Sequence, residues 1–440
     1  MTEETRLDGA ATMARLVAGD YADPDGGPPL SVPTRSVVIA DSLAGREDDC
    51  IDGVGLAGRL AVVCDRITQA VLGDGVARAL GDARCVVLED RPHADRETVE
   101  AIRAATASAD ALIAVGSGTI NDLCKFAAFQ DGKPYVVFAT APSMNGYTSV
   151  SAAITVDGLK KSLPAAAAVG VFMDLEVLAA APPRMIRSGL GDSLCRPTAQ
   201  ADWLLAHLLL DQPYREAPFA ILAADEEGLF AEPEALMAGD LAAMERLART
   251  LVLSGFGMTV CGGSYPASQG EHLISHYLDM MAPDLPESFH GEQIAVTTLT
   301  MARLQERLLA EGPPRLSASS MNEGAVTAHF GEALGHACWA EFAKKRLDEA
   351  TAERLNQRLE ERWDNIASRI SEIMKSSAEL QRILEQAGGP TRPRDLGWPD
   401  ALYARAVSHA RLIRHRYTAL DLAGDAGLLE DFSHGLTTAA

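Results

Sequence analysis

Two histidines and an aspartate, His272, His290 and Asp192, have the residue types and the sequence surroundings of a metal site. They lie in the segments SGLGDSLC (188–195), GEHLISHYLD (270–279) and HGEQIAV (290–296). Two imidazoles and one carboxylate are a frequent ligand set for a catalytic divalent metal, because they leave one coordination position open for substrate. The three segments are well separated along the chain, so three different elements must converge in the fold. We therefore predict that Asp192, His272 and His290 bind one divalent ion.

Upstream, the segment GSGTIND (116–122) forms a glycine turn between an apolar run and a helix-like segment. Glycine lets backbone N–H groups approach a phosphate, and the start of the following helix adds a favourable positive potential. We predict that Gly116, Ser117, Gly118 and Thr119 bind the pyrophosphate of a nucleotide cofactor. The segment is not GxGxxG, so a tight turn without a ligand explains this motif equally well by itself.

Polar residues near neighbouring strand ends extend the predicted cofactor site. Thr140 and Ser143 follow the next apolar run, and ligands of parallel sheets bind at the carboxyl ends of strands. Asp122 could point into that cleft or could cap the helix. Asp65 ends an earlier strand, where it could accept hydrogen bonds from an adenine ribose or could be an exposed turn residue. A carboxylate at the ribose would repel a 2′-phosphate, which favours NAD(H) over NADP(H).

Each predicted metal ligand also has a simpler structural explanation. His276 follows His272 by four residues, so on a helix the two rings share a face. One of them could instead be a buried, hydrogen-bonded histidine and the other a surface residue. Asp192 follows two glycines, which indicates a turn where it could equally cap a helix, and His290 could simply begin a helix. The joint presence of these residues with a nucleotide-binding turn favours a metal-assisted redox site.

The first half of the chain alternates between apolar, β-rich runs and helix-like segments. Continuous apolar strands separated by helical crossovers are typical of a parallel sheet covered on both faces. The predicted strands are 35–41, 59–65, 84–90, 110–115 and 134–140, and the predicted helices between them are 66–80 and 96–109. We expect 149–174 to be a β-rich addition to that sheet. The pattern indicates an α/β, Rossmann-like parallel-sheet domain.

After residue 176 the apolar residues recur with the 3.6-residue period of helices. The predicted helical segments are 193–210, 239–256, 267–281, 290–310, 325–388 with breaks, and 400–424. A charged, amphipathic run within 325–388 is expected to be a solvated helix and not a nucleic-acid-binding arm. We predict an N-terminal arm (1–34), a nucleotide-binding α/β domain (35–180) and an all-helical metal- and substrate-binding domain (181–440).

Composition and charge exclude several classes of partner. The 440 residues are 47% apolar and carry a net charge of −22, which disfavours nucleic acid and anionic membranes. The chain has no signal-like start and no apolar run of about 20 residues, and its seven cysteines never have CxxC spacing. We expect a cytoplasmic homodimer or higher homo-oligomer that acts on a small molecule, without nucleic-acid partners or membrane insertion.

Five motifs, in order, resemble those of the sn-glycerol-1-phosphate dehydrogenases. They read GSGTIND, TAPSMNGYTS, DLEVLAAAPPRMIRSGLGDSL, PASQGEHLISHYLDM and HGEQIAV. These enzymes belong to the superfamily of iron-containing alcohol dehydrogenases, glycerol dehydrogenases and 3-dehydroquinate synthases. The resemblance extends from about residue 35 to about residue 310. It implies the family fold, a Rossmann-like nucleotide domain followed by a helical metal-binding domain, as in dehydroquinate synthase.

The resemblance implies a role for each motif residue. The metal would be bound by Asp192, His272 and His290, with His276 near it. The pyrophosphate would be lined by Gly116, Ser117 and Gly118. The nicotinamide would lie by Thr140 and Ser143, and the adenosine ribose by Asp65. Asp122 would lie at the substrate and nicotinamide end of the cleft. Lys160 and Lys161 in GLKKSLPA, together with Arg196, are the candidate positive charges for a substrate phosphate, although a solvated turn explains the two lysines equally well.

The chain departs from the family pattern within the active-site motifs. Tyr265 stands where an arginine is common, Asn145 replaces an aspartate, and Cys195, Arg196 and Pro197 replace the usual residues after GDSL. Metal and nucleotide binding therefore carry over from the family more safely than recognition of a phosphorylated substrate does.

The implied reaction reduces dihydroxyacetone phosphate to sn-glycerol 1-phosphate, a step in phospholipid metabolism. A zinc ion, or iron or nickel, would act as a Lewis acid on the substrate oxygen while hydride passes from NAD(H) or NADP(H). The proton could come through His276 or Asp122. The main alternative is oxidation of an unphosphorylated polyol such as glycerol. A cyclising lyase like 3-dehydroquinate synthase is less favoured, because its highly anionic substrate needs more Lys and Arg than these motifs provide. A non-catalytic nucleotide-binding subunit is disfavoured because all three metal ligands are present.

Overall fold

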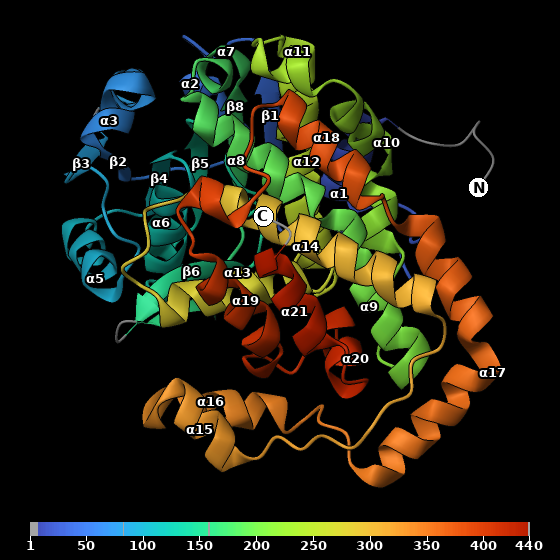
Figure 1. Ribbon diagram of the computed structural model, residues 1–440. Coiled ribbons are helices and arrows are strands. Elements are labelled where there is room, and N and C mark those ends of the chain that lie inside the picture. The colour runs from blue at the N-terminus through green and yellow to red at the C-terminus, as the bar shows by residue number, and fades with distance from the viewer. Residues whose placement is uncertain (1–7, 82, 157–158, 439–440) are drawn as a thin grey trace. The chain divides into compact units, whose positions relative to one another are not determined.

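The computed structural model describes residues 8–81, 83–156 and 159–438 (Figure 1). The chain forms two compact units, each built from two stretches of sequence. Unit 1 comprises Met1–Ser193 and Arg215–Ser264, and unit 2 comprises Leu194–Tyr214 and Tyr265–Ala440. The predicted boundary between residues 180 and 181 separates the α/β part of the sequence from the helical part, whereas the two units are defined by contacts. The boundary stays a prediction.

Unit 1 is organised around a six-stranded sheet in which every pairing is parallel, with the strand order β1-β8-β5-β4-β2-β3. The strands are β1 (Ser36–Ala40), β2 (Leu60–Asp65), β3 (Arg84–Leu88), β4 (Ala111–Gly116), β5 (Tyr135–Ala139) and β8 (Gly170–Asp174). The central strands β4, β5 and β8 are buried along their whole length, which explains their continuous apolar sequences. The predicted parallel α/β sheet is confirmed.

The expectation for residues 149–174 is only partly right. Strands β6 (Ser151–Val156) and β7 (Leu159–Pro164) form a separate antiparallel pair. Strand β8 does belong to the main sheet, as expected, and lies there between β1 and β5. The physical difference is burial: β6 alternates between buried and half-buried residues, whereas all five residues of β8 are buried.

Helices cover this sheet and fill the rest of unit 1. They are α1 (Gly9–Ala18), α2 (Glu47–Gly53), α3 (Arg66–Thr68), a π-helical turn (Gln69–Gly73), α4 (Asp74–Ala79), α5 (Arg96–Ala105), α6 (Gly118–Gln130), α7 (Leu175–Ala179), α8 (Pro183–Leu194), α10 (Ala217–Ala231), α11 (Pro233–Met237) and α12 (Leu241–Val260). The sheet core includes Val62, Ile113, Val136, Phe138 and Phe172, all fully buried. The predicted N-terminal arm contains α1, an element that the sequence analysis missed.

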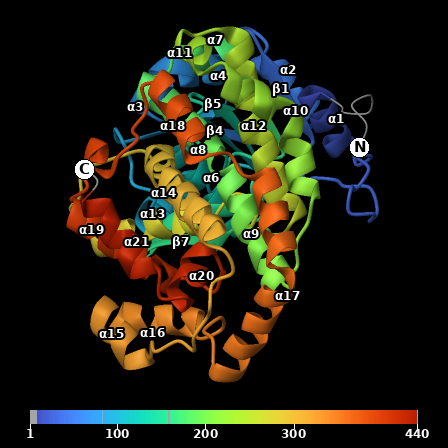
Figure 2. The same ribbon diagram turned by 45° about the vertical axis from the view of Figure 1, so that its right-hand side comes forward.

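The described residues of unit 2 form helices joined by loops and include no strand. Its helices are α9 (Arg196–Leu210), α13 (Gly270–Met281), α14 (His290–Glu311), α15 (Glu323–Phe330), α16 (Glu332–Phe342), α17 (Glu349–Ile373), α18 (Ser377–Gln386), α19 (Asp400–His409), α20 (Ala419–Asp425) and α21 (Leu429–Thr438), with 3-10 turns at Pro393–Leu396 and Ala410–Leu412. Helices α15 and α16 lie side by side in both views (Figure 1, Figure 2). One apolar core joins residues of most of these helices.

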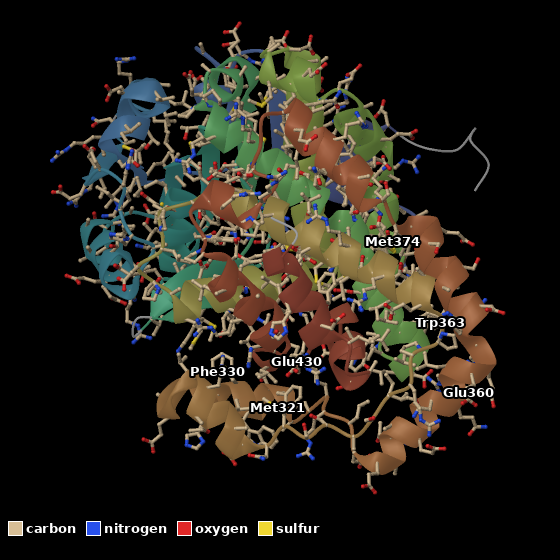
Figure 3. All side chains as sticks on the ribbon, viewed as in Figure 1. Met321, Phe330, Glu360, Trp363, Met374 and Glu430 are labelled. Carbon is tan, nitrogen blue, oxygen red and sulfur yellow. The ribbon has the colours of Figure 1, made fainter. Side chains whose placement is uncertain are left out.

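The charged, amphipathic segment predicted within residues 325–388 includes helix α17. Its buried residues recur every three or four positions, and among them Trp363 is only 7% exposed. Glu360, three residues earlier, is exposed, and both side chains are labelled in Figure 3. The run is therefore a surface helix with one apolar face, as its periodicity predicted. None of the described helices is long and apolar enough to cross a bilayer.

Candidate active site

The glycine turn connects β4 directly to α6. A Cβ atom on Gly116 would lie 2.6 Å from Cβ of Ile120, so the close approach of strand end and helix excludes any side chain there. Ser117 caps α6, and its Oγ accepts a hydrogen bond of 2.6 Å from the Gly118 amide. The strand–turn–helix context predicted for residues 116–119 is present, and their role in binding pyrophosphate stays a prediction.

The loop after β5 lies against this turn. Ser143 Oγ is 2.9 Å from Ser117 Oγ, and the Thr140 amide donates to the Gly116 carbonyl at 3.2 Å. Ser188 Oγ on α8 donates to the Ser143 carbonyl at 2.9 Å. The two loops predicted to contact one cofactor are thus neighbours within unit 1.

Tyr147 stabilises the second loop and was missed by the sequence analysis. Its side chain is fully buried, and its hydroxyl donates a hydrogen bond of 2.6 Å to the Ala141 carbonyl. Burial raises the pKa of this phenol, so it stays protonated as a donor. Its position in the TAPSMNGYTS motif was the signal that could have identified it.

Asp122 lies inside α6 and does not cap it, since the cap is Ser117. Its Oδ2 accepts the Ala153 amide of β6 at 2.9 Å, and its Oδ1 lies 3.6 Å from Nζ of Lys125. Lys125 is fully buried, and burial lowers the pKa of its amine. Its Nζ donates to the Gly146 carbonyl at 2.6 Å. Asp122 and Lys125 therefore join α6 to the β6 strand and to the second loop.

Asp65 ends β2 and caps α3. Its Oδ1 accepts the Thr68 amide at 2.7 Å, and the Thr68 hydroxyl in turn accepts the Asp65 amide at 3.0 Å. The side chain is buried, so the interpretation as an exposed turn residue is wrong. Its contact with an adenosine ribose stays a prediction.

Asp192 lies in α8, so the expected turn at SGLGDSLC is wrong. Gly189 of this segment serves close packing instead: a Cβ atom on it would lie 1.8 Å from the Pro142 carbonyl oxygen. The helix can therefore approach the loop after β5 only where it has no side chain. Asp192 is 1% exposed, and its Oδ2 accepts the Asn145 amide at 2.9 Å.

Within unit 2, the predicted histidine ligands converge at the starts of two helices. His272 lies in the first turn of α13, and His290 is the first residue of α14. Their Nε2 atoms are 3.3 Å apart. Two nitrogens bound to one tetrahedral zinc ion at 2.0–2.1 Å would be separated by about 3.3–3.4 Å. The pair therefore has the spacing of two ligands of a single ion, and Ser275 Oγ, which donates to Gln293 Oε1 at 2.6 Å, ties the two helices together.

His276 completes a group of three imidazoles. Its ring centroid lies 5.9 Å from that of His272 and 6.3 Å from that of His290. The shared helix face predicted from the four-residue spacing is present. His276 is thus close enough to influence a ligand bound at the other two rings.

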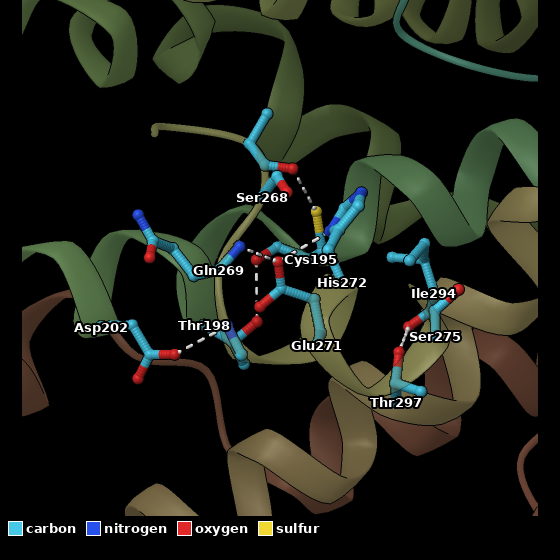
Figure 4. Close-up of polar contacts among 12 residues, drawn as sticks. Cys195, Thr198, Asp202, Ser268, Gln269, Glu271, His272, Ser275, Ile294 and Thr297 are labelled. Atoms are coloured by element: carbon cyan, nitrogen blue, oxygen red, sulfur yellow. Dashed lines mark hydrogen bonds and ion pairs between the residues drawn. The ribbon is translucent and has the colours of Figure 1, made fainter. Parts of the chain in front are cut away.

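A buried glutamate lies behind His272 and was missed by the sequence analysis. Glu271 is 0% exposed, and its Oε1 is 2.8 Å from Nδ1 of His272 (Figure 4). Cys195 belongs to the same group, with the Sγ, carboxylate and imidazole atoms all within 4.8 Å of one another. Burial raises the pKa of Glu271 to about 7. The signal in the sequence was an acidic residue directly before the first histidine of GEHLISH.

The residues predicted as positive charges for a substrate phosphate lie on separate elements, β7 and α9. Lys161 is exposed on β7, opposite Ile154 of β6, while the side chain of Lys160 lies outside the described residues. Arg196 begins α9 and donates to the Gln200 side chain.

A further arginine, Arg416, lies beside Tyr265. Its guanidinium is 4.7 Å from the ring centroid of Tyr265 and donates to the Ser268 carbonyl. Tyr265 in turn stacks on Trp203, with ring centroids 5.8 Å apart. Burial, and next the charge of Arg414, lower the pKa of Arg416 to about 10, so it is cationic at neutral pH. No local signal in the sequence links residues 265 and 416.

Sequence comparison gives a consistent group of relatives. The family profile described as iron-containing alcohol dehydrogenase matches residues 38–182. The glycerol-1-phosphate dehydrogenase (NAD(P)+) of Bacillus licheniformis is 28% identical over 411 residues, which cover 91% of both chains. The enzyme of the same name from Geobacillus stearothermophilus is 30% identical over 364 residues, or 81% of both chains.

Solved structures agree on the fold. A probable glycerol dehydrogenase from Sinorhizobium meliloti 1021 has a TM-score of 0.60 and 18% identity, and the match covers 91% of this chain and 98% of that one. Sulfoacetaldehyde reductase from Bifidobacterium kashiwanohense in complex with NAD+ has a TM-score of 0.59 and 17% identity over 96% of this chain and 99% of that one. At such identities the likeness concerns the fold alone.

Proposed function

Because the chain belongs to the superfamily of iron-containing alcohol dehydrogenases, we propose that it reduces dihydroxyacetone phosphate to sn-glycerol 1-phosphate. Membership makes it an NAD(P)-dependent oxidoreductase. The finer assignment of substrate is supported by relatives that are named glycerol-1-phosphate dehydrogenases and cover most of the chain.

We propose Asp192, His272 and His290 as the ligands of one divalent metal ion. The observation that carries this proposal is the 3.3 Å separation of the two Nε2 atoms, which suits two ligands of one ion. A metal held there would supply a Lewis acid for the substrate oxygen. Nitrogen and carboxylate ligands suit zinc, iron or nickel, and we favour zinc.

We propose that the nicotinamide cofactor binds over residues 116–119, with Thr140 and Ser143 on its nicotinamide side. The contact between Ser117 and Ser143 supports this, because it brings the two loops to one place at the carboxyl ends of β4 and β5. Asp65 at the end of β2 is proposed to bind the adenosine ribose. A carboxylate at that position favours NAD(H) over NADP(H).

For the proton we favour His276 over Asp122. Both carboxylate oxygens of Asp122 already accept hydrogen bonds, from the Asn121 side chain at 3.1 Å and from the Ala153 amide at 2.9 Å. We propose that Asp122 instead positions the β6 strand beside the cleft. The ring of His276 lies beside the proposed metal site, with its centroid 5.9 Å from that of His272.

For the substrate phosphate we propose Arg416 and Arg196, together with the predicted Lys160 and Lys161. Arg416 supports a phosphorylated substrate because it brings a cation to Tyr265. The second candidate, an unphosphorylated polyol, is favoured by the neutral Tyr265.

Steady-state kinetics separate the two functions. We expect kcat/KM for dihydroxyacetone phosphate to exceed that for dihydroxyacetone by at least about 100-fold, since a phosphate adds several charge-assisted hydrogen bonds. Equal efficiency on both ketones, with NADH and with NADPH, would exclude the phosphorylated substrate and support the polyol dehydrogenase.

A further inference from the structure

The buried carboxylate of Glu271 contacts the side of His272 that faces away from His290. Nδ1 of His272 is 2.8 Å from Glu271 Oε1, while Nε2 of the same ring is 3.3 Å from the other imidazole. Oε1 also accepts the backbone amide of Gln269 at 2.7 Å. Figure 4 shows Glu271 beside His272 and Gln269 at the start of α13.

The distance decides between two interpretations of the group formed by Cys195, Glu271 and His272. Two ligand atoms of a tetrahedral zinc ion are separated by about 3.3–3.5 Å. The 2.8 Å between Nδ1 and Oε1 is shorter and lies in the range of a charge-assisted N–H···O hydrogen bond. Glu271 is therefore a hydrogen-bond partner of His272 and not a ligand of a second ion.

We propose that Glu271 positions His272 for the metal by fixing its tautomer. A proton on Nδ1 donates to Glu271, which leaves the Nε2 lone pair directed toward His290. The inference rests on the proposed metal site and goes beyond it by assigning the residue that prepares that site. Carboxylate partners of this kind typically contribute 10–100-fold to metal affinity.

The surroundings of Glu271 keep its carboxylate in place. Asp202 on α9 accepts the Gly270 amide at 3.1 Å and the Ala419 amide at 3.0 Å, so it holds the first residues of α13 and α20. Gln305 Nε2 donates to Asp202 as well, at 2.9 Å. The start of α13 is thus anchored independently of Glu271, and loss of the Glu271 side chain should leave this helix end in position.

Glu292 offers a matched control. It is a buried glutamate in the first turn of α14, two residues after His290, as Glu271 is one residue before His272. Its Oε2 accepts the backbone amide of Phe289 at 2.9 Å. The same substitution to glutamine at both positions therefore compares the carboxylate that contacts Nδ1 of His272 with a second buried carboxylate in the first turn of a neighbouring helix.

The test measures zinc affinity of the full chain by competition with a chromophoric chelator. We expect Glu271→Ala to weaken binding about 10–100-fold. Glu271→Gln should weaken it about 5-fold or more, because an amide oxygen is the weaker acceptor. Glu292→Gln should stay within about twofold of the unaltered chain. Nitrogen-15 spectra of labelled histidines provide a second readout, in which His272, identified by its loss in His272→Ala, should change tautomer only in the Glu271 variants.

The outcomes are distinguishable. Glu271 variants that bind zinc as tightly as Glu292→Gln and keep the His272 tautomer would overturn the positioning role. If Glu271→Ala does not fold, the two glutamine variants decide by the same criterion. If the unaltered chain binds no zinc, or binds it equally well after His290→Ala, the proposed metal site fails, and this differs from failure of the role of Glu271.

Discussion

Replacement of Gly189 by alanine should destabilise the chain, although alanine is the better helix former. The added Cβ would lie 1.8 Å from the Pro142 carbonyl oxygen, and such contacts are not found below about 3 Å, so α8 and the loop must separate by more than about 1 Å. We take the steric cost as about 3 kcal/mol, the upper end for overpacking, because the obstacle is backbone. The gain in helix propensity offsets about 1 kcal/mol, which leaves a net loss of about 2 kcal/mol.

The assay is equilibrium urea unfolding followed by circular dichroism, with zinc affinity measured on the folded variant. Separation of α8 from the loop would also break the bond from the Asn145 amide to Asp192, so zinc binding should weaken along with stability. Gly75→Ala in α4 is the control, since its Cβ would meet only Glu47 Oε1 at 3.5 Å, an ordinary contact. It should raise stability by up to about 1 kcal/mol. A Gly189→Ala variant with an unchanged or higher unfolding midpoint would refute the reasoning.

Four further predictions concern the site and the pH dependence. His290→Ala should reduce bound metal, measured by elemental analysis, and should lower kcat at least about 100-fold while the unfolding midpoint of the sheet domain is kept; full activity in metal-free protein would contradict it. Asp65→Asn should shift the NADPH-to-NADH affinity ratio toward NADPH, since the repelling charge is removed while asparagine still caps α3; an unaltered chain that binds NADPH at least about tenfold tighter than NADH would exclude the ribose role. Arg416→Gln should raise KM for dihydroxyacetone phosphate at least about tenfold and leave KM for dihydroxyacetone nearly unchanged; an equal rise for both would indicate a structural role. Burial, and next the charge of the stacked His409, lower the pKa of His329 to about 4, below the 6.5 of the unfolded chain. The contribution of His329 to the free energy of unfolding is therefore highest above pH 6.5 and decreases as the pH falls toward 4, because in that window the unfolded chain binds a proton at residue 329 and the folded chain does not. His329→Gln should therefore flatten the decline of the urea midpoint between pH 6.5 and 4, and an unchanged slope would refute the assignment.

Local pattern was enough to predict many of the elements and the class of fold. The apolar runs that became β2, β4 and β5 are continuous because these strands are covered on both faces, and the 3.6-residue period marked α13, α14 and α17. Residue types and order also identified the superfamily and the two histidines that converge. The spacing of apolar residues within a strand or helix is a local feature of the sequence, because it depends on which face of that element is buried.

Tertiary packing decided what no local pattern contains. SGLGDSLC has the composition of a turn but is helical, because its glycine permits contact with a carbonyl 47 residues earlier in the chain. Strand β8 lies inside the main sheet, whereas the hairpin before it does not. The two differ in burial, which is complete in β8 and depends on the tertiary structure. The link between Arg416 and Tyr265 joins residues about 150 positions apart. The orientation of Glu271 toward His272 depends on how Asp202 of α9 holds the start of α13. These contacts join residues that are far apart in the sequence, so they form only after the chain between them has folded. The spacing of the residues therefore does not predict them.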